Sequence, residues 1–434
     1  MRSVNMSHIK LFGIYNQEKS QIMRYLFIVT EKYSANGICV NAVMQKLISD
    51  GHQVECISNR EFGEEKSFYK DGIQYWGVKP RCVYSISSRS VNSKESKLVK
   101  RILCIVSFLL NKIQLLLSIP TWPVISRSYS KRIYSIAKRL YEENPFDFII
   151  PTYTQIDTVI ATMNIKKEHP EVFFIPYFLD SLAGGYGPKV FSKEWVEKRG
   201  LKWENKLLQT ADLVVMMQSS RDFYNRHKNK LSYFGKIKFL DIPLFAPKRN
   251  VSFYRKKDTN KKHIIYVGSI PAHIRNPQFF LEVFTSLKRD DIDLTIIGPS
   301  TCESLLSDFC LRDNRIERIQ YVSHEEALRR IDNADILLNL GNNITTMMPS
   351  KIFEYMSSGK PIISTAPIKK EPCIPYLKNY EYAHIVDEDS PVSVEAAKLD
   401  DFISNAKMVD PNKLKNVFYL NTADAFVSTI NNLK

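Results

Sequence analysis

Short apolar runs alternate with amphipathic helical patterns along most of the chain. This alternation is typical of strand–helix–strand units, in which parallel strands form a buried sheet. The runs form two series, and the second restarts after a polar interval. We therefore predict an α/β protein with two parallel sheets. The predicted strands are residues 24–30, 53–58, 146–151, 172–178 and 212–217 in the first series, and 263–269, 293–299, 316–322, 334–340 and 361–365 in the second.

The polar interval, residues 246–262, is rich in Lys and Arg and is typical of an interdomain linker. It separates two Rossmann-like domains, residues 23–245 and residues 263–410. Residues 1–22 carry no apolar run long enough for a signal peptide, so we expect a loose N-terminal extension. Residues 411–434 are expected to form a C-terminal helix that packs back toward the first domain. Two domains of about 200 residues each suit a chain of this length.

The chain has 61 Lys plus Arg against 46 Asp plus Glu, a formal net charge of +15 at pH 7. Such a field favours a negative partner, namely a nucleic acid, an anionic membrane surface or a phosphorylated small molecule. No compact nucleic-acid motif accompanies the charge, so we expect no nucleic-acid partner. The seven cysteines include no C-x-x-C pair. We expect reduced thiols in a cytosolic protein, with neither disulfides nor zinc.

Residues 94–141 depart from the alternating pattern. They contain the apolar run "ILCIVSFLLNKIQLLLSIP", with Lys and Arg dense on both sides. Asn111, Lys112 and Gln114 interrupt the run too early for a spanning helix, which needs about 20 mostly apolar residues. Two interpretations remain open: a helix lying in an anionic membrane surface, or a core helix with a solvated basic flank. The density of basic residues favours the membrane-associating segment.

The stretch "MMPSKIFEYMSSGKPIIST", residues 347–365, predicts a short helix followed by a buried strand. Pro349 suits the first helical position and Gly359 the position just past the end, so the helix is expected near residues 349–358. Its apolar stripe is expected to face inward.

Polar side chains occupy the first two turns of this helix. A helix N-terminus presents unpaired N–H groups and the positive end of the dipole, which suits a pyrophosphate. Ser350 and Lys351 would add a hydroxyl and a charge, and the Glu354 carboxylate would meet a ribose diol one turn further along. The alternative is that Glu354 only pairs with Lys351 at i, i+3.

A second stretch, "YVGSIPAHIRNPQFFLEVF" at residues 266–284, runs from a strand through Gly268 and a loop to Arg275. The glycine lets the backbone approach a ligand closely, and an arginine at a loop end can grip phosphate bidentately. Because both stretches follow strands of one parallel sheet, they favour one phosphate site at its carboxyl edge.

The motifs "YVGSI…RNPQFFLEVF", "DLTIIGP", "IQYVSHEEALRRIDNADILLNL" and "MPSKIFEYMSSGKPII" occur in this order, and "RYLFIVTEKYSANGICVNAVMQKLISDGHQVECIS" opens the first domain. With these motifs the chain resembles GT-B glycosyltransferases, most of all the GT4-like group that builds bacterial polysaccharides. The resemblance implies two Rossmann-like domains facing a central cleft, with the nucleotide-sugar donor on the second domain and the acceptor on the first.

For the donor, the resemblance implies that Arg275 neutralises the diphosphate, that Ser350 and Lys351 face phosphate, and that Glu354 holds the ribose. Thr346 stands where the first Glu of the family's E-x7-E motif is expected, and Ser269 where a basic residue usually follows the glycine. The predicted donor-binding residues are Gly268, Ser269, Arg275, Thr346, Met347, Met348, Ser350, Lys351 and Glu354.

For the acceptor, the resemblance implies that the glycine loop, here with Asn36 and Gly37, faces the cleft. Thr152 follows a strand where many relatives carry a histidine, so we assign no catalytic histidine. Asp180, beside a glycine-rich loop, is the candidate carboxylate near the acceptor, and its alternative role is to cap a turn. The predicted acceptor-side residues are Asn36, Gly37, Thr152 and Asp180, and the predicted catalytic residues are Arg275, Lys351 and Asp180.

The expected activity is transfer of a sugar from a nucleotide-diphosphate sugar to a lipid-linked saccharide, by a retaining hexosyltransferase at the cytoplasmic face of the membrane. No Asp-x-Asp pair stands where it would chelate a metal, so no metal or other cofactor is expected. A sugar-nucleotide epimerase on the same scaffold and a non-enzymatic polyanion-binding protein are the alternatives. No GxGxxG follows either first strand, which disfavours a dinucleotide-dependent oxidoreductase.

Overall fold

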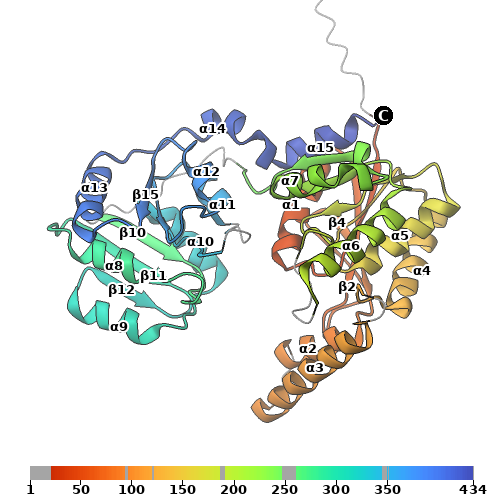
Figure 1. Ribbon diagram of the computed structural model, residues 1–434, viewed down its shortest axis with the longest axis horizontal. Helices are drawn as coiled ribbons and strands as arrows, with labels where there is room; N and C mark the ends of the chain where they lie inside the picture. The colour runs from red at the N-terminus through yellow and green to blue at the C-terminus, as the bar shows by residue number, and fades with distance from the viewer. Residues whose placement is uncertain are drawn as a thin grey trace, which may run out of the picture.

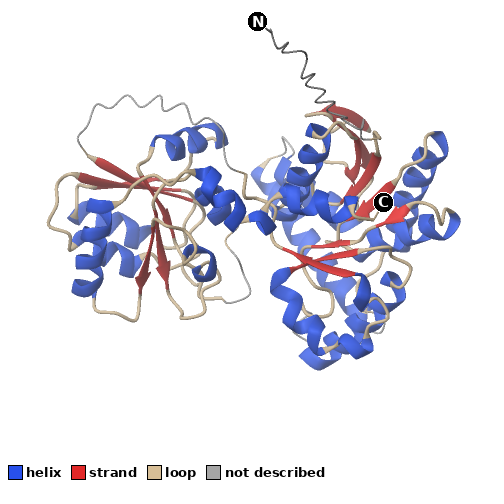
Figure 2. Ribbon diagram, turned by 90° about the horizontal axis from the view of Figure 1, so that it is seen from above, coloured by secondary structure: helices blue, strands red, loops and turns tan. Residues whose placement is uncertain are grey.

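A computed structural model describes residues 21–92, 96–119, 122–185, 191–246, 261–344, 349 and 351–433. It contains two α/β domains, each with helices around a central sheet (Figures 1 and 2). The predicted fold class is confirmed.

The first domain has a six-stranded sheet of order β3-β4-β2-β1-β5-β6, parallel except for the β3–β4 pair. A three-stranded parallel sheet of order β7-β8-β9 continues beyond it. The predicted strand 172–178 is divided between the two sheets around Pro176, which has no N–H to donate to a ladder. The strands are β1 (Arg24–Val29), β2 (Gln53–Asn59), β3 (Ser67–Lys70), β4 (Ile73–Val78), β5 (Phe148–Pro151), β6 (Phe173–Phe174), β7 (Tyr177–Phe178), β8 (Val214–Met217) and β9 (Ile237–Leu240).

Helices cover both faces of the first sheet because successive side chains of each strand point to opposite sides. Tyr25 and Phe27 of β1 belong to the core beneath α1 and the C-terminal helix α15. Leu26 and Ile28 belong to the core beneath α4 and α5. The helices are α1 (Ala35–Ser49), α2 (Cys82–Asn92), α3 (Lys97–Leu117), α4 (Arg127–Glu143), α5 (Ile156–Glu168), α6 (Lys193–Leu208) and α7 (Arg221–Arg226).

The second domain has a fully parallel sheet of order β12-β11-β10-β13-β14-β15. Its strands are β10 (Lys262–Val267), β11 (Ile292–Ile297), β12 (Ile316–Ile319), β13 (Ile336–Asn339), β14 (Ile362–Ala366) and β15 (Ala383–Asp387). Its helices are α8 (Gln278–Thr285), α9 (Glu303–Arg312), α10 (His324–Asn333), α11 (Lys351–Ser357), α12 (Ile374–Leu377) and α13 (Val392–Asn405).

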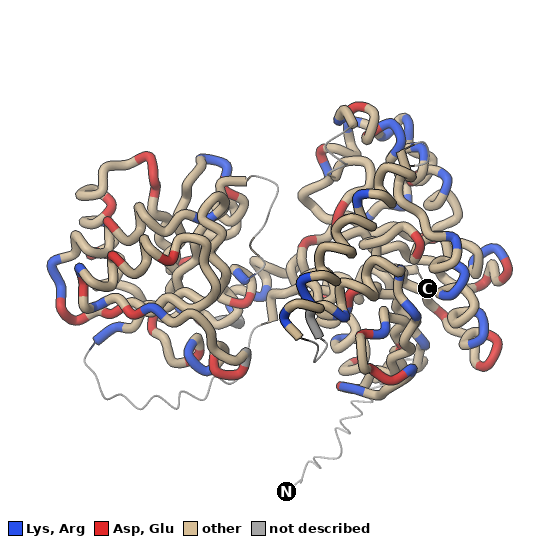
Figure 3. The backbone as a smooth tube through the Cα atoms, turned by 90° about the horizontal axis from the view of Figure 1, so that it is seen from below, with Lys and Arg blue, Asp and Glu red and all other residues tan. Residues whose placement is uncertain are grey.

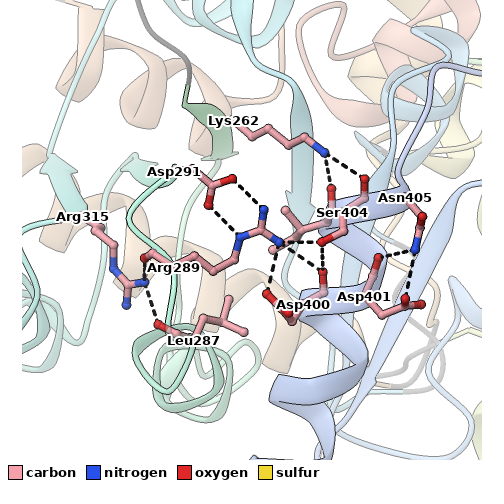
Figure 4. Close-up of polar contacts among 10 residues, drawn as sticks. Lys262, Leu287, Arg289, Asp291, Arg315, Asp400, Asp401, Ser404 and Asn405 are labelled. Carbon is pink, nitrogen blue, oxygen red and sulfur yellow. Dashed lines mark hydrogen bonds and ion pairs between the residues drawn. The ribbon is translucent and has the colours of Figure 1, made fainter.

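A polar network fastens α13 beside the start of β11 (Figure 4). The Arg289 guanidinium donates to both carboxylate oxygens of Asp291, at 2.8 and 2.7 Å, and to Asp400 on α13 at 3.1 Å. Arg315 donates to the carbonyl oxygens of Leu287 at 2.9 Å and of Arg289 at 2.5 Å. These bonds satisfy backbone carbonyls at the amino edge of the sheet. They lie at the edge opposite to the carboxyl ends of the strands.

The predicted segment 94–141 contains two helices with different surroundings. α4 is a packed helix of the first domain, with Tyr129 and Ile133 fully buried. α3 has no buried residue, and it forms a hairpin with α2 that projects from the domain (Figure 1). Among the described helices, none has both the length and the apolar character needed to cross a membrane.

The chain returns to the first domain at its end. α14 (Pro411–Val417) leads to α15 (Ala423–Asn431), which packs against α1 (Figure 1). The Phe426 ring lies 4.8 Å from the Tyr177 ring, measured between centroids. Phe426, Val427 and Ile430 are buried in the same core as β1. The C-terminal helix is therefore part of the first domain's core.

We predict that Phe426→Ala lowers the free energy of unfolding by about 3–5 kcal/mol, because it removes a buried aromatic side chain and leaves a cavity. Urea denaturation followed by circular dichroism measures the loss. Leu420→Ala, at a side chain that is 47% exposed, is the control and should change the free energy by less than about 1 kcal/mol. Equal losses in both variants would contradict a specific role for α15.

Candidate functional site

The carboxyl edge of the second sheet gathers those predicted donor residues that the structure describes: Gly268, Ser269, Arg275, Lys351 and Glu354. β10 ends at Val267 and passes directly into Gly268 and Ser269. The Lys351 Nζ, from the first residue of α11, donates to the Val267 carbonyl at 2.7 Å. A Cβ on Gly268 would lie 2.9 Å from the Tyr266 hydroxyl. Any other residue at this position would therefore displace the tyrosine side chain. The loop after β10 and the start of α11 therefore lie side by side.

Arg275 is oriented by a relay of side chains. Its Nε donates to the Asn342 Oδ1 at 2.5 Å, and one of its Nη atoms reaches the Ser269 carbonyl at 3.5 Å. The Asn342 N–H donates to the Glu371 carboxylate at 3.3 Å, and the Cys373 N–H donates to the same carboxylate at 2.7 Å. Burial raises the pKa of Glu371, and these backbone donors oppose that rise. The relay leaves guanidinium N–H groups available for a ligand.

Asn342 and Glu371 were not predicted from the sequence. The only available signal was the position of Asn342 in "LGNN", directly after a buried strand, where parallel sheets bind ligands. Glu371 lies 29 residues further on in a loop, so nothing local connects it to Arg275.

The start of α11 carries the remaining donor groups. Ile352, Phe353 and Met356 are buried, as their spacing predicts, while Glu354 is exposed. Gly359 follows the helix with φ of 72°, a conformation that favours glycine.

Lys351 and Glu354 do not form an ion pair within the described part of the chain; Lys351 binds a carbonyl instead. The surrounding protein desolvates Lys351 and lowers its pKa; the Glu354 charge opposes this and the Arg275 charge adds to it. Four predicted donor residues lie outside the described residues: Thr346, Met347, Met348 and Ser350.

On the first domain, the structure brings two predicted acceptor-side residues together. The Asn36 Nδ2 donates to the Asp180 carboxylate at 3.1 Å. The neighbouring Gly37 is required sterically, because a Cβ there would lie 2.4 Å from the carbonyl oxygens of Glu31 and Lys32. The tight β1–α1 loop thereby places Asn36 beside Asp180.

Thr152 does not join this group. It is fully buried, and its backbone N–H donates to the Ile28 carbonyl at 2.9 Å. Its carbonyl accepts from the Thr158 hydroxyl at 2.9 Å, so the residue serves the packing of β5 and α5.

A buried carboxylate holds the loop that follows Asp180. Glu204 of α6 is fully buried and accepts from the Ala183 N–H at 3.0 Å and from the hydroxyls of Tyr224 and Tyr233 at 2.9 and 2.8 Å. The Tyr224 hydroxyl also lies 2.7 Å from the Ser181 hydroxyl. Burial raises the pKa of Glu204 to about 7, against the effect of these donors. The sequence analysis missed Glu204 because a lone Glu in a helix has no distinguishing pattern.

The Cys39 thiol of α1 is influenced electrostatically by both groups. Burial raises the pKa of the Cys39 thiol on α1 to about 12, its own backbone N–H opposes that rise, and the Asp180 and Glu354 charges add to it. Cys39 therefore lies within electrostatic reach of a carboxylate from each domain. No group of three or more His, Cys, Asp or Glu side chains is arranged to hold a metal ion among the described residues.

Comparison with solved structures defines the class of fold. A glycosyltransferase from Rickettsia africae superimposes with a TM-score of 0.60 at 14% identity, covering 95% of this chain and 99% of that one. The lipopolysaccharide outer core galactosyltransferase WaaB gives a TM-score of 0.51 at 14% identity, covering 94% and 99%. A trehalose-6-phosphate protein from E. coli, bound with UDP-2-fluoro glucose, gives 0.56 at 11%, covering 94% and 98%. The chain has the GT-B fold.

The sequence comparison is narrower and agrees. Residues 261–393 match the family model for glycosyl transferases group 1. No curated protein matches the chain. The resemblance to GT-B glycosyltransferases is thus confirmed, and the family match and the fold support sugar transfer as the class of reaction.

We predict that Glu204 makes stability depend on pH. Its folded pKa lies near 7 against 4.5 for a free side chain, so between these values the folded state binds more protons than the unfolded state. Stability therefore falls as pH rises from about 4.5 to 7, by up to about 3 kcal/mol from this group.

Glu204→Gln removes the titration while keeping the shape. Subtracting its free energy of unfolding from that of the wild type at each pH isolates the effect of Glu204, and this difference should decline across that window. A pH-independent difference would contradict the assignment.

Proposed function

We propose that this protein transfers a sugar from a nucleotide-diphosphate sugar to a saccharide acceptor carried on a lipid, in the synthesis of a cell-surface polysaccharide. The observation that carries the proposal is the convergence of Arg275, Lys351 and Glu354 at the carboxyl edge of the second parallel sheet. Two cations and a carboxylate in that order along the site match a diphosphate followed by a ribose.

The chemistry rests on position and charge. Arg275 and Lys351 would stabilise the negative charge that develops on the leaving diphosphate, and the relay through Asn342 keeps the guanidinium aimed at it. Asp180, held by Asn36, would orient an acceptor hydroxyl. We propose a retaining hexosyl transfer in which a diphosphate oxygen takes the acceptor proton, so that no histidine or metal is needed.

The lipid acceptor is supported by the α2–α3 hairpin. α3 exposes large apolar side chains along its length, including Ile105, Phe108 and Leu109, which are 53%, 57% and 51% exposed. The basic residues Lys97, Lys100 and Arg101 lie in its first turns. An apolar face beside a cationic one suits a helix lying in an anionic membrane surface. We therefore propose that α3 holds the protein on an anionic membrane surface, and that this surface is the cytoplasmic face.

We predict that one nucleotide-diphosphate sugar from a panel of UDP, GDP, ADP and dTDP donors raises the melting temperature of the wild type. Arg275→Ala should lower the affinity for that donor roughly 10- to 100-fold, because a charge-assisted hydrogen bond is lost. Glu354→Gln should weaken binding of the donor more than binding of inorganic pyrophosphate, which has no ribose.

Arg312→Ala, at an exposed arginine that forms an ion pair with Asp308 of the same helix, is the matched control. Transfer of radiolabel from the donor to an organic-extractable product tests the reaction itself. Recovery of the label as free epimerised sugar nucleotide would instead support the epimerase alternative. Unchanged donor affinity in Arg275→Ala would contradict the site.

We predict that Ile105→Asp together with Phe108→Asp lowers binding to phosphatidylglycerol vesicles at least tenfold, because two charges would have to enter the membrane interface. Both side chains are exposed, so the fold should remain intact. Leu311→Asp, at an 88% exposed leucine on α9, is the control and should bind as the wild type does. Vesicle flotation measures the outcome, and equal recovery of all three proteins would refute the role of α3.

A further inference from the structure

A cation-lined cavity lies between β4 and α4 of the first domain, and it shares no lining residue with the donor and acceptor groups described above. Its volume is 480 Å³, and it is lined by Arg60, Lys66, Lys79 and Arg139 together with Trp76. The four cations come from different segments: the end of β2, the loop before β3, the end of β4, and α4. Within the described chain, no carboxylate lines this cavity.

Backbone contacts hold together the segments that carry two of these cations. The Arg60 N–H donates to the Val78 carbonyl at 2.9 Å, and the Gly77 N–H donates to the Lys66 carbonyl at 2.7 Å. A Cβ on Gly77 would lie 3.1 Å from the Arg60 Cβ and 3.2 Å from the Lys66 carbonyl oxygen. Glycine at position 77 lets the segments that carry Arg60 and Lys66 approach each other. Both residues therefore line the same cavity.

Little of this charge is neutralised by the protein. Arg139 lies over the Trp76 ring, 5.1 Å from its centroid, and forms an exposed ion pair with Glu143 at 3.1 Å. The Trp76 indole N–H is already donated to Glu55 at 2.7 Å. For the other three cations the structure shows no carboxylate partner among the described residues. Because like charges repel, a bound anion would stabilise this arrangement, and Arg and Lys together suit a phosphate.

A second cavity adjoins the first at Lys79, which lines both. Its volume is 660 Å³, and it lies between α2, α3 and the start of α4, with apolar walls that include Leu110, Ile113 and Leu117. Arg132 fixes the segment between the cavities, since its guanidinium donates to the carbonyls of Lys79 at 3.0 Å and Pro80 at 3.1 Å. The cationic cavity, which is large enough to hold a phosphate, thus adjoins an apolar one under the projecting helix.

We propose that these two cavities form a single site for a phosphate-bearing lipid, with the phosphate among Arg60, Lys66, Lys79 and Arg139 and the hydrocarbon chain beneath α3. The charge selects an anionic head, and the apolar wall selects an amphiphile over a free phosphate. The site does not depend on which sugar is transferred, and it gives the α2–α3 hairpin a specific ligand in addition to a membrane surface.

Isothermal titration calorimetry with dihexanoyl phosphatidic acid, a lipid phosphate soluble as a monomer, tests the site on the whole chain. The wild type should bind it at least tenfold more tightly than sn-glycerol 3-phosphate, which lacks the chains, and than dihexanoyl phosphatidylcholine, whose head is zwitterionic. Arg60→Gln and Lys66→Gln should each weaken binding of the lipid phosphate roughly tenfold. Ile113→Ser should weaken its binding roughly fivefold and leave the binding of glycerol phosphate unchanged.

Two controls match these variants. Lys70→Gln removes an exposed lysine of β3 that lines neither cavity, and Ile105→Ser changes an exposed residue of α3 that lines neither. Both should bind dihexanoyl phosphatidic acid as the wild type does. An equal loss of lipid-phosphate affinity in Lys70→Gln and Lys66→Gln would mean that the lipid phosphate is attracted only by the net charge of the protein. This result would overturn the site.

Equal affinities for glycerol phosphate and the lipid phosphate would overturn the lipid assignment, and absence of lipid-phosphate binding would overturn the whole proposal. The rise in melting temperature that each nucleotide sugar produces is measured separately in the same variants. Because Arg60 and Lys66 lie outside the donor group, donor binding should persist in them, so failure of this site and failure of the proposed function are distinguishable.

Discussion

Parallel strand pairing is the constraint on which the candidate site depends. In a parallel sheet, every strand ends at the same edge, so each loop that leaves a strand is delivered to one side of the domain. β10 delivers Ser269 and the loop to Arg275, and β13 delivers Asn342. The site therefore combines residues about 70 positions apart in the sequence. Each of them lies in the loop that directly follows its own strand.

Buried carboxylates complete the arrangement on both domains. Glu371 fixes Asn342 beneath Arg275, and Glu204 fixes the loop beside Asp180. Each accepts backbone N–H groups that the loop could not otherwise satisfy, which offsets the cost of burying a charge. The half-buried Arg275 and the exposed Asp180 can then meet a ligand without large losses of side-chain entropy.

The sequence predicted the parts of the molecule that depend on local pattern. The central sheet of each domain and the apolar stripe of α11 follow from periodicity, and the end of α11 follows from Gly359; the separate three-stranded sheet was not predicted. β3, β4, β9 and β15 were missed because these strands are short, so alternation has too few residues to show. Glu371 and Glu204 were missed because their roles arise from contacts distant in sequence.

Thr152 follows a strand, as the prediction required, yet its side chain is packed inward. The position of a residue after a strand predicts that it lies at the carboxyl edge of the sheet. Whether its side chain faces outward depends on packing, which the local sequence does not reveal.

The return of α15 to the first domain has a consequence for synthesis of the chain. Residues near 426 are made after the whole second domain, yet they fill the core beneath β1 and α1, which are made before it. During translation the apolar side of α1 is therefore without its final cover until the second domain has been completed. Contacts that join the two ends of a chain form slowly, and surfaces that wait for them are prone to misassociation. The first domain can reach its native state only after α15 has been made, so it cannot finish folding before the second domain has been synthesised.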